Sequence, residues 1–242
     1  METATSEKIP VWFDIDGTLL HTKAGHGAFR VALEEIYGWR DTLVEVRFAG
    51  NTDLRVLLDL AEKHGGCPRE TRRKQESFFT RMAEHLDRGL HAESPELVPG
   101  AYELVHALQS REDVSLGLLT GNARLCAMIK LRHVGLDIHF SEGAFGDQHH
   151  DRNHLARMAV ELLAGSAGMN GGHAARKGLV IGDTTRDVRA AKEIGARCLA
   201  VATGSDGPDE LKAAGAERVV TDLHPTPALL DWILAGEGHL GK

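Results

Sequence analysis

Short apolar runs alternate with amphipathic stretches along most of this chain. Near-continuous apolar runs predict strands buried on both faces of a sheet at residues 10–15, 114–120, 178–183 and 196–203. Shorter strands are expected within residues 137–147 and 217–220. Apolar residues three or four positions apart predict helices at 99–110, 122–135, 151–165, 184–195, 207–215 and 226–236. Strands that alternate with helices of this length favour a doubly wound, Rossmann-like α/β fold with a parallel sheet.

Residues 21–93 interrupt this alternation. Helical periodicity and stop signals predict helices at 24–38, 52–65 and 68–89, with no convincing strand among them. The chain is therefore expected to have an α/β core, residues 1–20 and 94–242, with an all-helical domain inserted at 21–93. A stretch rich in glycine and alanine, residues 165–178, is expected to be a loop.

Polar side chains follow three of the predicted strands at the point where each ends. The sequences are DIDGT at residues 14–18, TGN at 120–122 and GDTTRD at 182–187. Ligands of such sheets bind outside the carboxyl ends of the strands, so these residues are expected to meet in one crevice. Converging carboxylates repel one another and stay ionised only with a cation among them. Oxygen ligands favour Mg²⁺, and without cysteine in the cluster zinc is not expected.

Composition narrows the class of partner. The chain has 242 residues and a formal net charge of −7, which argues against a nucleic-acid partner. No window holds the ~18 apolar residues that a membrane span needs, so no membrane partner is expected. The N-terminus has no apolar core of a signal peptide, and the three cysteines lie far apart. A cytoplasmic protein, monomeric or homodimeric, is expected.

The three motifs, in this order and each after an apolar strand, resemble those of the haloacid dehalogenase superfamily. The match is closest to the branch that is similar to phosphoglycolate phosphatases, and it covers nearly the whole chain. The helical insert resembles the cap domain of that superfamily, which lies between the first and second motifs.

The resemblance implies a Mg²⁺-dependent phosphatase that hydrolyses a small phosphorylated metabolite through an aspartyl-phosphate. Asp14 would be the nucleophile, and Asp16 would be first the general acid and then the general base. Asp14, Asp183 and the carbonyl of Asp16 would bind Mg²⁺. The resemblance further assigns a phosphoryl contact to Thr120, support of the metal site to Asp187 and Thr184, and substrate binding to Thr18, Gly121, Asn122 and the cap residue Asn51. His21, Thr52 and Arg55 are further candidates for substrate selection.

One element departs from the family pattern. Members carry a lysine that pairs with the nucleophile, usually before a proline, and no Lys-Pro occurs here in that context. Lys177 lies at the start of a strand, about 20 Å from Asp183 at ~3.3 Å per residue, and thus at the wrong end of the sheet. Arg152 opens a helix after the preceding strand, and its guanidinium could hold both Asp14 and phosphate. Arg152 is therefore the preferred candidate and Lys177 the alternative.

Other functions remain as alternatives. A phosphomutase would share the same core, and a non-catalytic binding protein of this fold would be expected to lack one essential carboxylate. A dehalogenase would lack the second aspartate, and a phosphonate hydrolase would need a reactive cap lysine, for which Lys23 and Lys63 lack the context. A dinucleotide-binding enzyme is disfavoured because no G-x-G-x-x-G follows the first strand.

Overall fold

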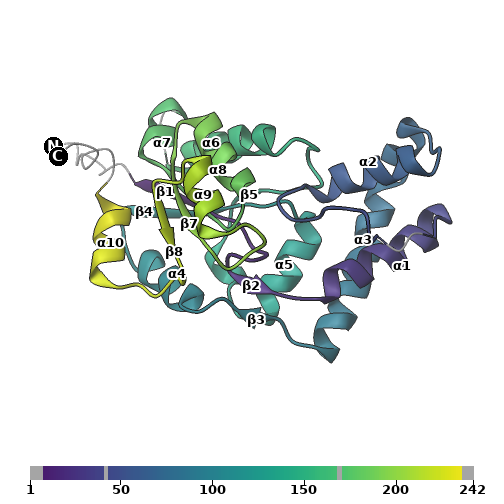
Figure 1. The fold of residues 1–242 in the computed structure, drawn as a ribbon, viewed down its shortest axis with the longest axis horizontal. Helices are drawn as coiled ribbons and strands as arrows, with labels where there is room; N and C mark the ends of the chain where they lie inside the picture. Colours follow the sequence, from purple (N-terminus) through teal and green to yellow (C-terminus); the bar gives the residue numbers. More distant parts are fainter. Residues whose placement is uncertain (1–7, 41–42, 168–170, 236–242) are drawn as a thin grey trace.

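The molecule is built on a six-stranded sheet (Figure 1). The computed structural model describes residues 8–40, 43–167 and 171–235. In spatial order the strands are β5 (Gly143–Ala144), β4 (Val114–Leu119), β1 (Ile9–Phe13), β6 (Leu179–Gly182), β7 (Arg197–Val201) and β8 (Arg218–Val220). Every neighbouring pair is parallel. The predicted doubly wound α/β fold is confirmed.

The side chains of β1 show why its sequence is apolar throughout. Val11 and Phe13 pack into the core on one face of the sheet, and Trp12 packs into the core on the other. The first face is covered by α4 (Ala101–Gln109), α5 (Arg124–His133) and α10 (Pro227–Leu234). The second is covered by α6 (Arg152–Ala167), α7 (Gly171–Lys177), α8 (Thr185–Ile194) and α9 (Pro208–Ala214). Because successive side chains of a strand alternate between faces, a central strand covered on both sides must be apolar at every position.

The prediction of a loop at residues 165–178 is wrong, because the described residues of this stretch are mostly helical. Helix α6 continues to Ala167, and α7 occupies Gly171–Lys177, while residues 168–170 lie outside the described part of the chain. Alanine has the highest helix propensity, and Ala174 and Ala175 are buried against the sheet. Burial of this small apolar face outweighs the cost of the glycines. A short 3₁₀ helix, η1 (Asp137–His139), precedes β5.

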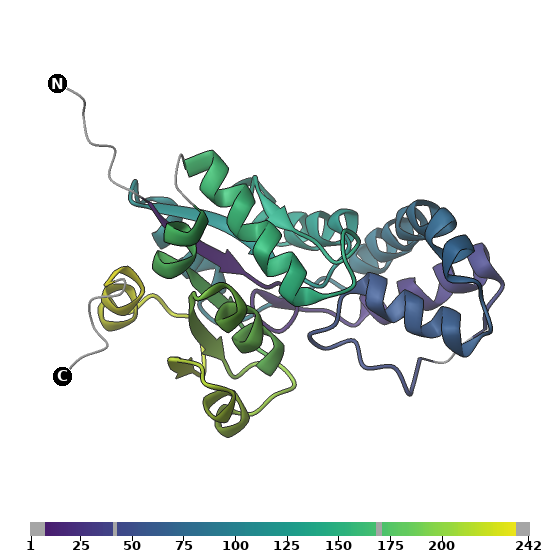
Figure 2. The ribbon, with the colours of Figure 1, turned by 90° about the horizontal axis from the view of Figure 1, so that it is seen from above.

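Three helices form a separate segment beyond one end of the sheet (Figures 1 and 2). They are α1 (Ala24–Tyr37), α2 (Asp53–Lys63) and α3 (Pro68–Ala92). This three-helix segment has its own apolar core, which includes Phe29, Leu57, Phe78 and Leu86. Phe78 contacts the rings of Phe29 and Tyr37. Packing among α1, α2 and α3, rather than helix propensity alone, therefore holds the segment together.

The two chain connections to the three-helix segment are paired with each other. Residues Leu20–His21 form β2, residues Glu96–Leu97 form β3, and the two strands are antiparallel. This pairing was not predicted, because two-residue strands leave no periodic pattern. Leu20 is buried, and Val98 N donates to Leu19 O at 2.9 Å. The two covalent connections between this segment and the sheet thus run side by side as one narrow ribbon.

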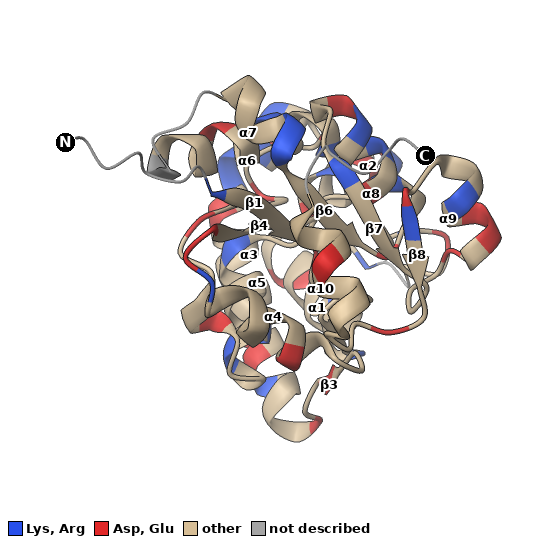
Figure 3. Cartoon of the chain, turned by 90° about the vertical axis from the view of Figure 1, so that its left-hand side faces the viewer, with Lys and Arg blue, Asp and Glu red and all other residues tan. Residues whose placement is uncertain are grey.

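Acidic and basic residues are interspersed over the helices that flank the sheet (Figure 3). Within the described ranges, no helix has the length and apolar character required to cross a bilayer.

Truncation of Phe78 tests the core of the three-helix segment. Its side chain is 0% exposed, so Phe78→Ala should lower the free energy of unfolding by about 3 to 5 kcal/mol, because a cavity replaces the ring. Urea unfolding followed by circular dichroism would measure the change. The control is Ile138→Ala, since Ile138 is 82% exposed and its truncation should cost less than about 0.5 kcal/mol. Equal losses in the two variants would contradict the packing described here.

Candidate active site

The turn after β1 places the first two carboxylates. Asp14 follows the strand directly, and its backbone N–H donates to Ile181 O of β6 at 2.9 Å. The chain then turns at Gly17, whose φ is +78°. A Cβ at this position would lie 2.3 Å from Asp183 Oδ2. Glycine is therefore required here both for the left-handed backbone and for the close approach of the turn to Asp183.

The end of β6 supplies Asp183 and the start of α8. Asp183 is 3% exposed, and Thr18 Oγ1 donates to its Oδ1 at 3.1 Å. Thr184 precedes α8, and both its backbone N and its hydroxyl donate to Asp187 Oδ2, at 3.0 and 2.7 Å. The first bond gives a partner to a backbone N–H at the helix start that has none within the helix. Together the two bonds hold the Asp187 carboxylate at the ends of the strands. Thr184 lines the cavity, whereas Asp187 is completely buried.

The end of β4 contributes an amide and a hydroxyl. Thr120 Oγ1 accepts from Asn122 Nδ2 at 3.0 Å, and the same amide donates to Asp16 Oδ2 at 2.8 Å. Gly121 lies against the backbone of the segment before α2, since a Cβ there would be 2.0 Å from Asn51 O. The TGN motif thus orients Asp16 on one side and touches the three-helix segment on the other.

Arg152 lies next to Asp14, the candidate nucleophile. It is the first residue of α6, and Asp151 Oδ1 accepts from the backbone N of Asn153 at 2.9 Å at this helix start. Arg152 Nη2 is 3.2 Å from Asp14 Oδ2, donates to Leu119 O at 3.1 Å, and also pairs with Asp187 Oδ1. Lys177 instead ends α7, before β6, whereas Asp183 follows β6. Lys177 and the carboxylates therefore lie at opposite ends of β6.

Sequence reasoning missed Lys130, a buried lysine of α5. Its ammonium lies 2.8 and 2.6 Å from the two carboxylate oxygens of Asp16 and 2.5 Å from Asn122 Oδ1. The residue is 4% exposed. The signal was present, because Lys130 falls on the apolar stripe of its helix with Cys126, Ala127 and Leu131, all of which are buried. A lysine within such a stripe needs a carboxylate partner.

The pKa values of the neighbouring carboxylates Asp14 and Asp16 are shifted in opposite directions, although an ion pair acts to lower each of them. Burial, with repulsion from Asp187 and Asp16, raises the pKa of Asp14 to about 6 against the opposing charge of Arg152. Burial also acts to raise the pKa of Asp16, but Lys130 and the Asn122 amide outweigh it and hold that pKa below its ordinary value. The Asp16 side chain is 47% exposed and faces the cavity. Two carboxylates only two residues apart thus have different environments.

Asp14, Asp183 and Asp187 form a carboxylate cluster that could hold a metal ion. One oxygen from each lies within 4.8 Å of the others, and all three residues are buried. Burial and repulsion from Asp187 and Asp14 raise the pKa of Asp183 well above its ordinary value. Asp14 Oδ1 is buried and has no hydrogen-bond partner among the described residues. Uncompensated carboxylate oxygens of this kind fit a hard divalent cation.

The strand-end residues open into a cavity of roughly 620 Å³. Its lining includes Asp14, Asp16, Gly121, Asn122, Lys130, Arg152 and Asp183 from the sheet side, and His21, His26, Phe48, Asn51, Asp53 and Met82 from the other. Thr18 and Thr120 are fully buried and do not line it. Thr52 caps α2, and Arg55 pairs with Asp59 at the surface. The structure therefore brings most of the expected site residues together, but Thr52 and Arg55 lie outside the cavity.

Residues 47–54 close one side of this cavity. Asp53 N donates to Gly121 O at 2.7 Å, and Leu54 N donates to Gly146 O at 3.1 Å. Arg186 of α8 pairs with Asn51 Oδ1. Asp53 is itself buried, and burial raises its pKa to about 7 even though its carboxylate accepts from Ala123 N at 2.7 Å. This short loop bridges the three-helix segment to the ends of β4 and β6.

A family model for haloacid dehalogenase-like hydrolases matches residues 11–201. The chain belongs to this family. The prediction of the family from the three motifs is confirmed, and with it a hydrolase of the haloacid dehalogenase type. Among curated proteins, no sequence matches the chain.

Solved structures of similar proteins have the same fold. A hydrolase from Pseudomonas syringae has a TM-score of 0.68 at 25% identity, over 93% of this chain and 99% of the other. CbbY from Rhodobacter sphaeroides, in complex with phosphate, has a TM-score of 0.68 at 20% identity, over 92% and 98%. A predicted phosphoglycolate phosphatase from Haemophilus somnus has a TM-score of 0.63 at 19% identity, over 92% and 97%. The likeness therefore extends over the whole haloacid dehalogenase-like fold, the three-helix segment included.

Neutralising Asp14 should stabilise the metal-free protein. The pKa of Asp14 rises from 3.8 to about 6 on folding, so its ionisation opposes folding, and stability is lost as the pH rises between these values. Asp14→Asn should therefore raise the free energy of unfolding by roughly 2 to 3 kcal/mol at pH 8 and have little effect near pH 4. Urea unfolding in EDTA at both pH values would measure the difference.

Asp113→Asn is the matched control. The Asp113 carboxylate pairs with Arg111 at the surface, and the hydrogen bond from Arg111 lowers its pKa, so removal of its charge should not stabilise the protein at pH 8. If Asp14→Asn also failed to stabilise the protein at pH 8, the carboxylates would not be repelling one another as described.

Proposed function

We propose that this chain is a Mg²⁺-dependent phosphatase that hydrolyses a small phosphate monoester through an aspartyl-phosphate on Asp14. The observation that carries the proposal is the buried, unpartnered Oδ1 of Asp14 beside Arg152 and Asp183 at the cavity. The Asp14 carboxylate lies next to the cation of Arg152 and next to Asp183, which could bind a metal ion. This arrangement suits attack on an anionic phosphate, whose charge must be neutralised.

Asp14 would attack phosphorus, and the bond between phosphorus and the ester oxygen would break. Arg152, 3.2 Å from Asp14 Oδ2, would neutralise charge on the nucleophile and on the phosphoryl group. Its other contacts, to Leu119 O and Asp187, hold the guanidinium plane in place before substrate arrives. Gly121 and Asn122, which line the cavity at the end of β4, are proposed to orient the phosphoryl oxygens. Thr120 would hold the amide of Asn122 in place, and Thr18 would do the same for Asp183.

Asp16 would protonate the leaving alkoxide and then accept a proton from the water that hydrolyses the aspartyl-phosphate. Its side chain is exposed to the cavity, as both steps require. Lys130 and Asn122 hold the carboxylate through four contacts of 2.5 to 2.8 Å among the three residues. Lys130 is therefore proposed as a positioning residue for the acid and base.

Mg²⁺ is proposed to bind Asp14, Asp183 and the carbonyl of Asp16. When bound, it would neutralise charge on the phosphoryl group and on the carboxylates. Asp187 is better suited to positioning than to ligation, because its oxygens already accept hydrogen bonds from Arg152 and Thr184. Thr184 would hold Asp187 in this role.

The three-helix segment is proposed to act as a cap, within a division into residues 1–20 and 94–242 for the core and 21–93 for the cap. His21, Asn51 and Met82 line the cavity and would contact the part of the substrate beyond its phosphate. The structure of CbbY in complex with phosphate, a protein of the same fold, supports a phosphorylated ligand. The pairing of β2 with β3 makes this ribbon the candidate hinge.

Phosphate release from a panel of metabolite monoesters and an aryl phosphate would test the function. Release should require Mg²⁺, stop in EDTA and fall to background in Asp14→Asn, because an amide at this position cannot attack phosphorus as the carboxylate would. Asp113→Asn should retain full activity. Release that persists in Asp14→Asn would exclude Asp14 as the nucleophile. Isomerisation of a sugar phosphate without release would indicate a phosphomutase instead.

Lys130→Met should lower kcat/KM by roughly 100-fold for an alkyl phosphate, because Asp16 loses its orienting partner. The loss should be smaller for an aryl phosphate, whose leaving group needs less protonation. Steady-state kinetics with both esters would measure this difference. Lys192→Met is the control, since Lys192 is exposed and its ammonium donates to the carbonyl of Ala214, away from the cavity. An equal loss for both esters would show that Lys130 does not act through protonation of the leaving group.

A further inference from the structure

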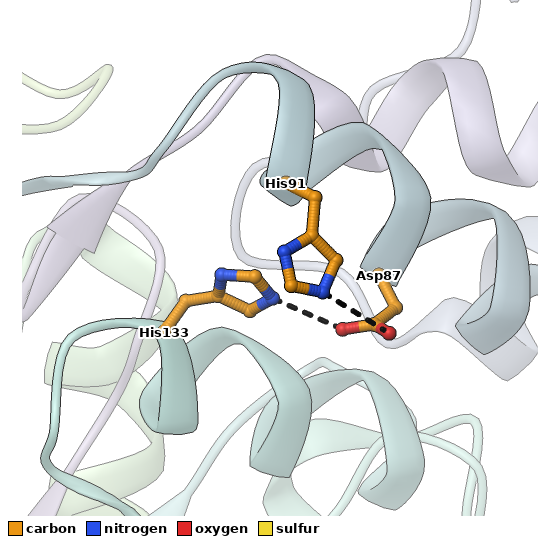
Figure 4. Close-up of side chains that lie close together, drawn as sticks. All are labelled: Asp87, His91 and His133. Atoms are coloured by element: carbon orange, nitrogen blue, oxygen red, sulfur yellow. Dashed lines mark hydrogen bonds and ion pairs between the residues drawn. The ribbon is translucent and has the colours of Figure 1, made fainter.

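A second group of potential metal ligands shares no residue with the cluster of Asp14, Asp183 and Asp187. Asp87 and His91 occupy one face of the last turns of α3, and His133 is the last residue of α5 (Figure 4). The two imidazole rings lie side by side, and the Nε2 atom of each faces the carboxylate of Asp87 (Figure 4). The spacing of four residues between Asp87 and His91 puts both side chains on the same side of the helix.

The distances among these side chains fit a metal site. His133 Nε2 is 3.0 Å from Asp87 Oδ1, and His91 Nε2 is 3.8 Å from Asp87 Oδ2. One ligand atom from each of the three residues lies within 4.8 Å of the others. Tetrahedral Zn²⁺ with bonds near 2.0 to 2.1 Å places its ligands about 3.4 Å apart, so small rotations of the side chains would complete the site.

The donor set selects the class of ion. Two imidazoles and one carboxylate suit Zn²⁺ and similar borderline cations, whereas Mg²⁺ prefers oxygen ligands alone. The His91 side chain is 74% exposed and that of His133 is 14% exposed, so an ion could enter from solvent while resting against a partly buried ligand.

The site would also join two parts of the molecule. Its ligands come from α3 of the three-helix segment and from α5, which packs on the sheet. His133 lies one helical turn after Lys130, the residue that pairs with Asp16. We propose that Asp87, His91 and His133 bind a Zn²⁺-class ion that fastens α3 to α5. This proposal does not depend on the phosphatase reaction.

Isothermal titration with Zn²⁺ in a large excess of Mg²⁺ would test the site, since Mg²⁺ competes for the oxygen ligands of the carboxylate cluster. The wild-type chain should bind one Zn²⁺ more than His91→Gln, or bind it at least tenfold more tightly. His133→Gln should show the same loss as His91→Gln. Equal stoichiometry and affinity in the wild type and His91→Gln would overturn the proposal.

His85→Gln is the matched control. His85 lies on the same helix and pairs with a carboxylate, Glu35, but its other ring nitrogen contacts Arg88 rather than a second histidine. This variant should bind Zn²⁺ as the wild type does. A loss in His85→Gln equal to that in His91→Gln would indicate unspecific binding by helix histidines and would contradict the site.

Hydrogen exchange would test the fastening of the two helices. Zn²⁺ should slow exchange of the backbone amides in the last turns of α3 and α5, and should leave these rates unchanged in His91→Gln. Binding of Zn²⁺ without slower exchange in the wild type would overturn the claim that the ion joins α3 to α5.

Discussion

Electrostatic repulsion among three buried carboxylates is the constraint around which this structure is arranged. Asp14, Asp183 and Asp187 converge within 4.8 Å at the ends of two adjacent strands. Arg152 contacts two of them, and its cation is the main compensation that the described residues offer. Because this compensation is incomplete, burial leaves Asp14 and Asp183 with raised pKa values. Protons would therefore compete with a divalent cation for the same oxygens.

The two layers of helices supply one cation each to the turn after β1. Arg152 comes from α6 on one face of the sheet and pairs with Asp14, and Lys130 comes from α5 on the other face and pairs with Asp16. The effects of these pairs differ because Asp14 also faces other carboxylates, whereas Asp16 has an amide partner and contact with the cavity. Sheet topology thus gives two adjacent carboxylates different electrostatic environments.

The strands, most helices and the positions of Asp14, Asp183 and Arg152 at strand or helix ends could be predicted from the sequence, because burial on both faces leaves long apolar runs. Lys130 was missed although it lies on the apolar stripe of its helix, because a single charged residue in a helix is usually at the surface. The prediction of a loop at residues 165–178 was wrong because it was based on the glycine content. The alanines of this stretch pack against the sheet, and this tertiary contact favours a helix. The β2–β3 pairing depends on contacts between residues 75 and 77 positions apart in the chain, for which no local pattern exists.

The ribbon of β2 and β3 has a consequence for how such a molecule can diverge. Leu20 pairs with Leu97, and His21 pairs with Glu96, so the chain leaves the sheet and returns to it at adjacent points. The ends of the three-helix segment therefore meet, and its length and shape place no strain on the register of the strands. Changes to this segment can alter what the cavity admits while the carboxylates remain in place. Selectivity for the ligand of the cavity could therefore change during evolution through the three-helix segment alone, without movement of the carboxylates at the strand ends.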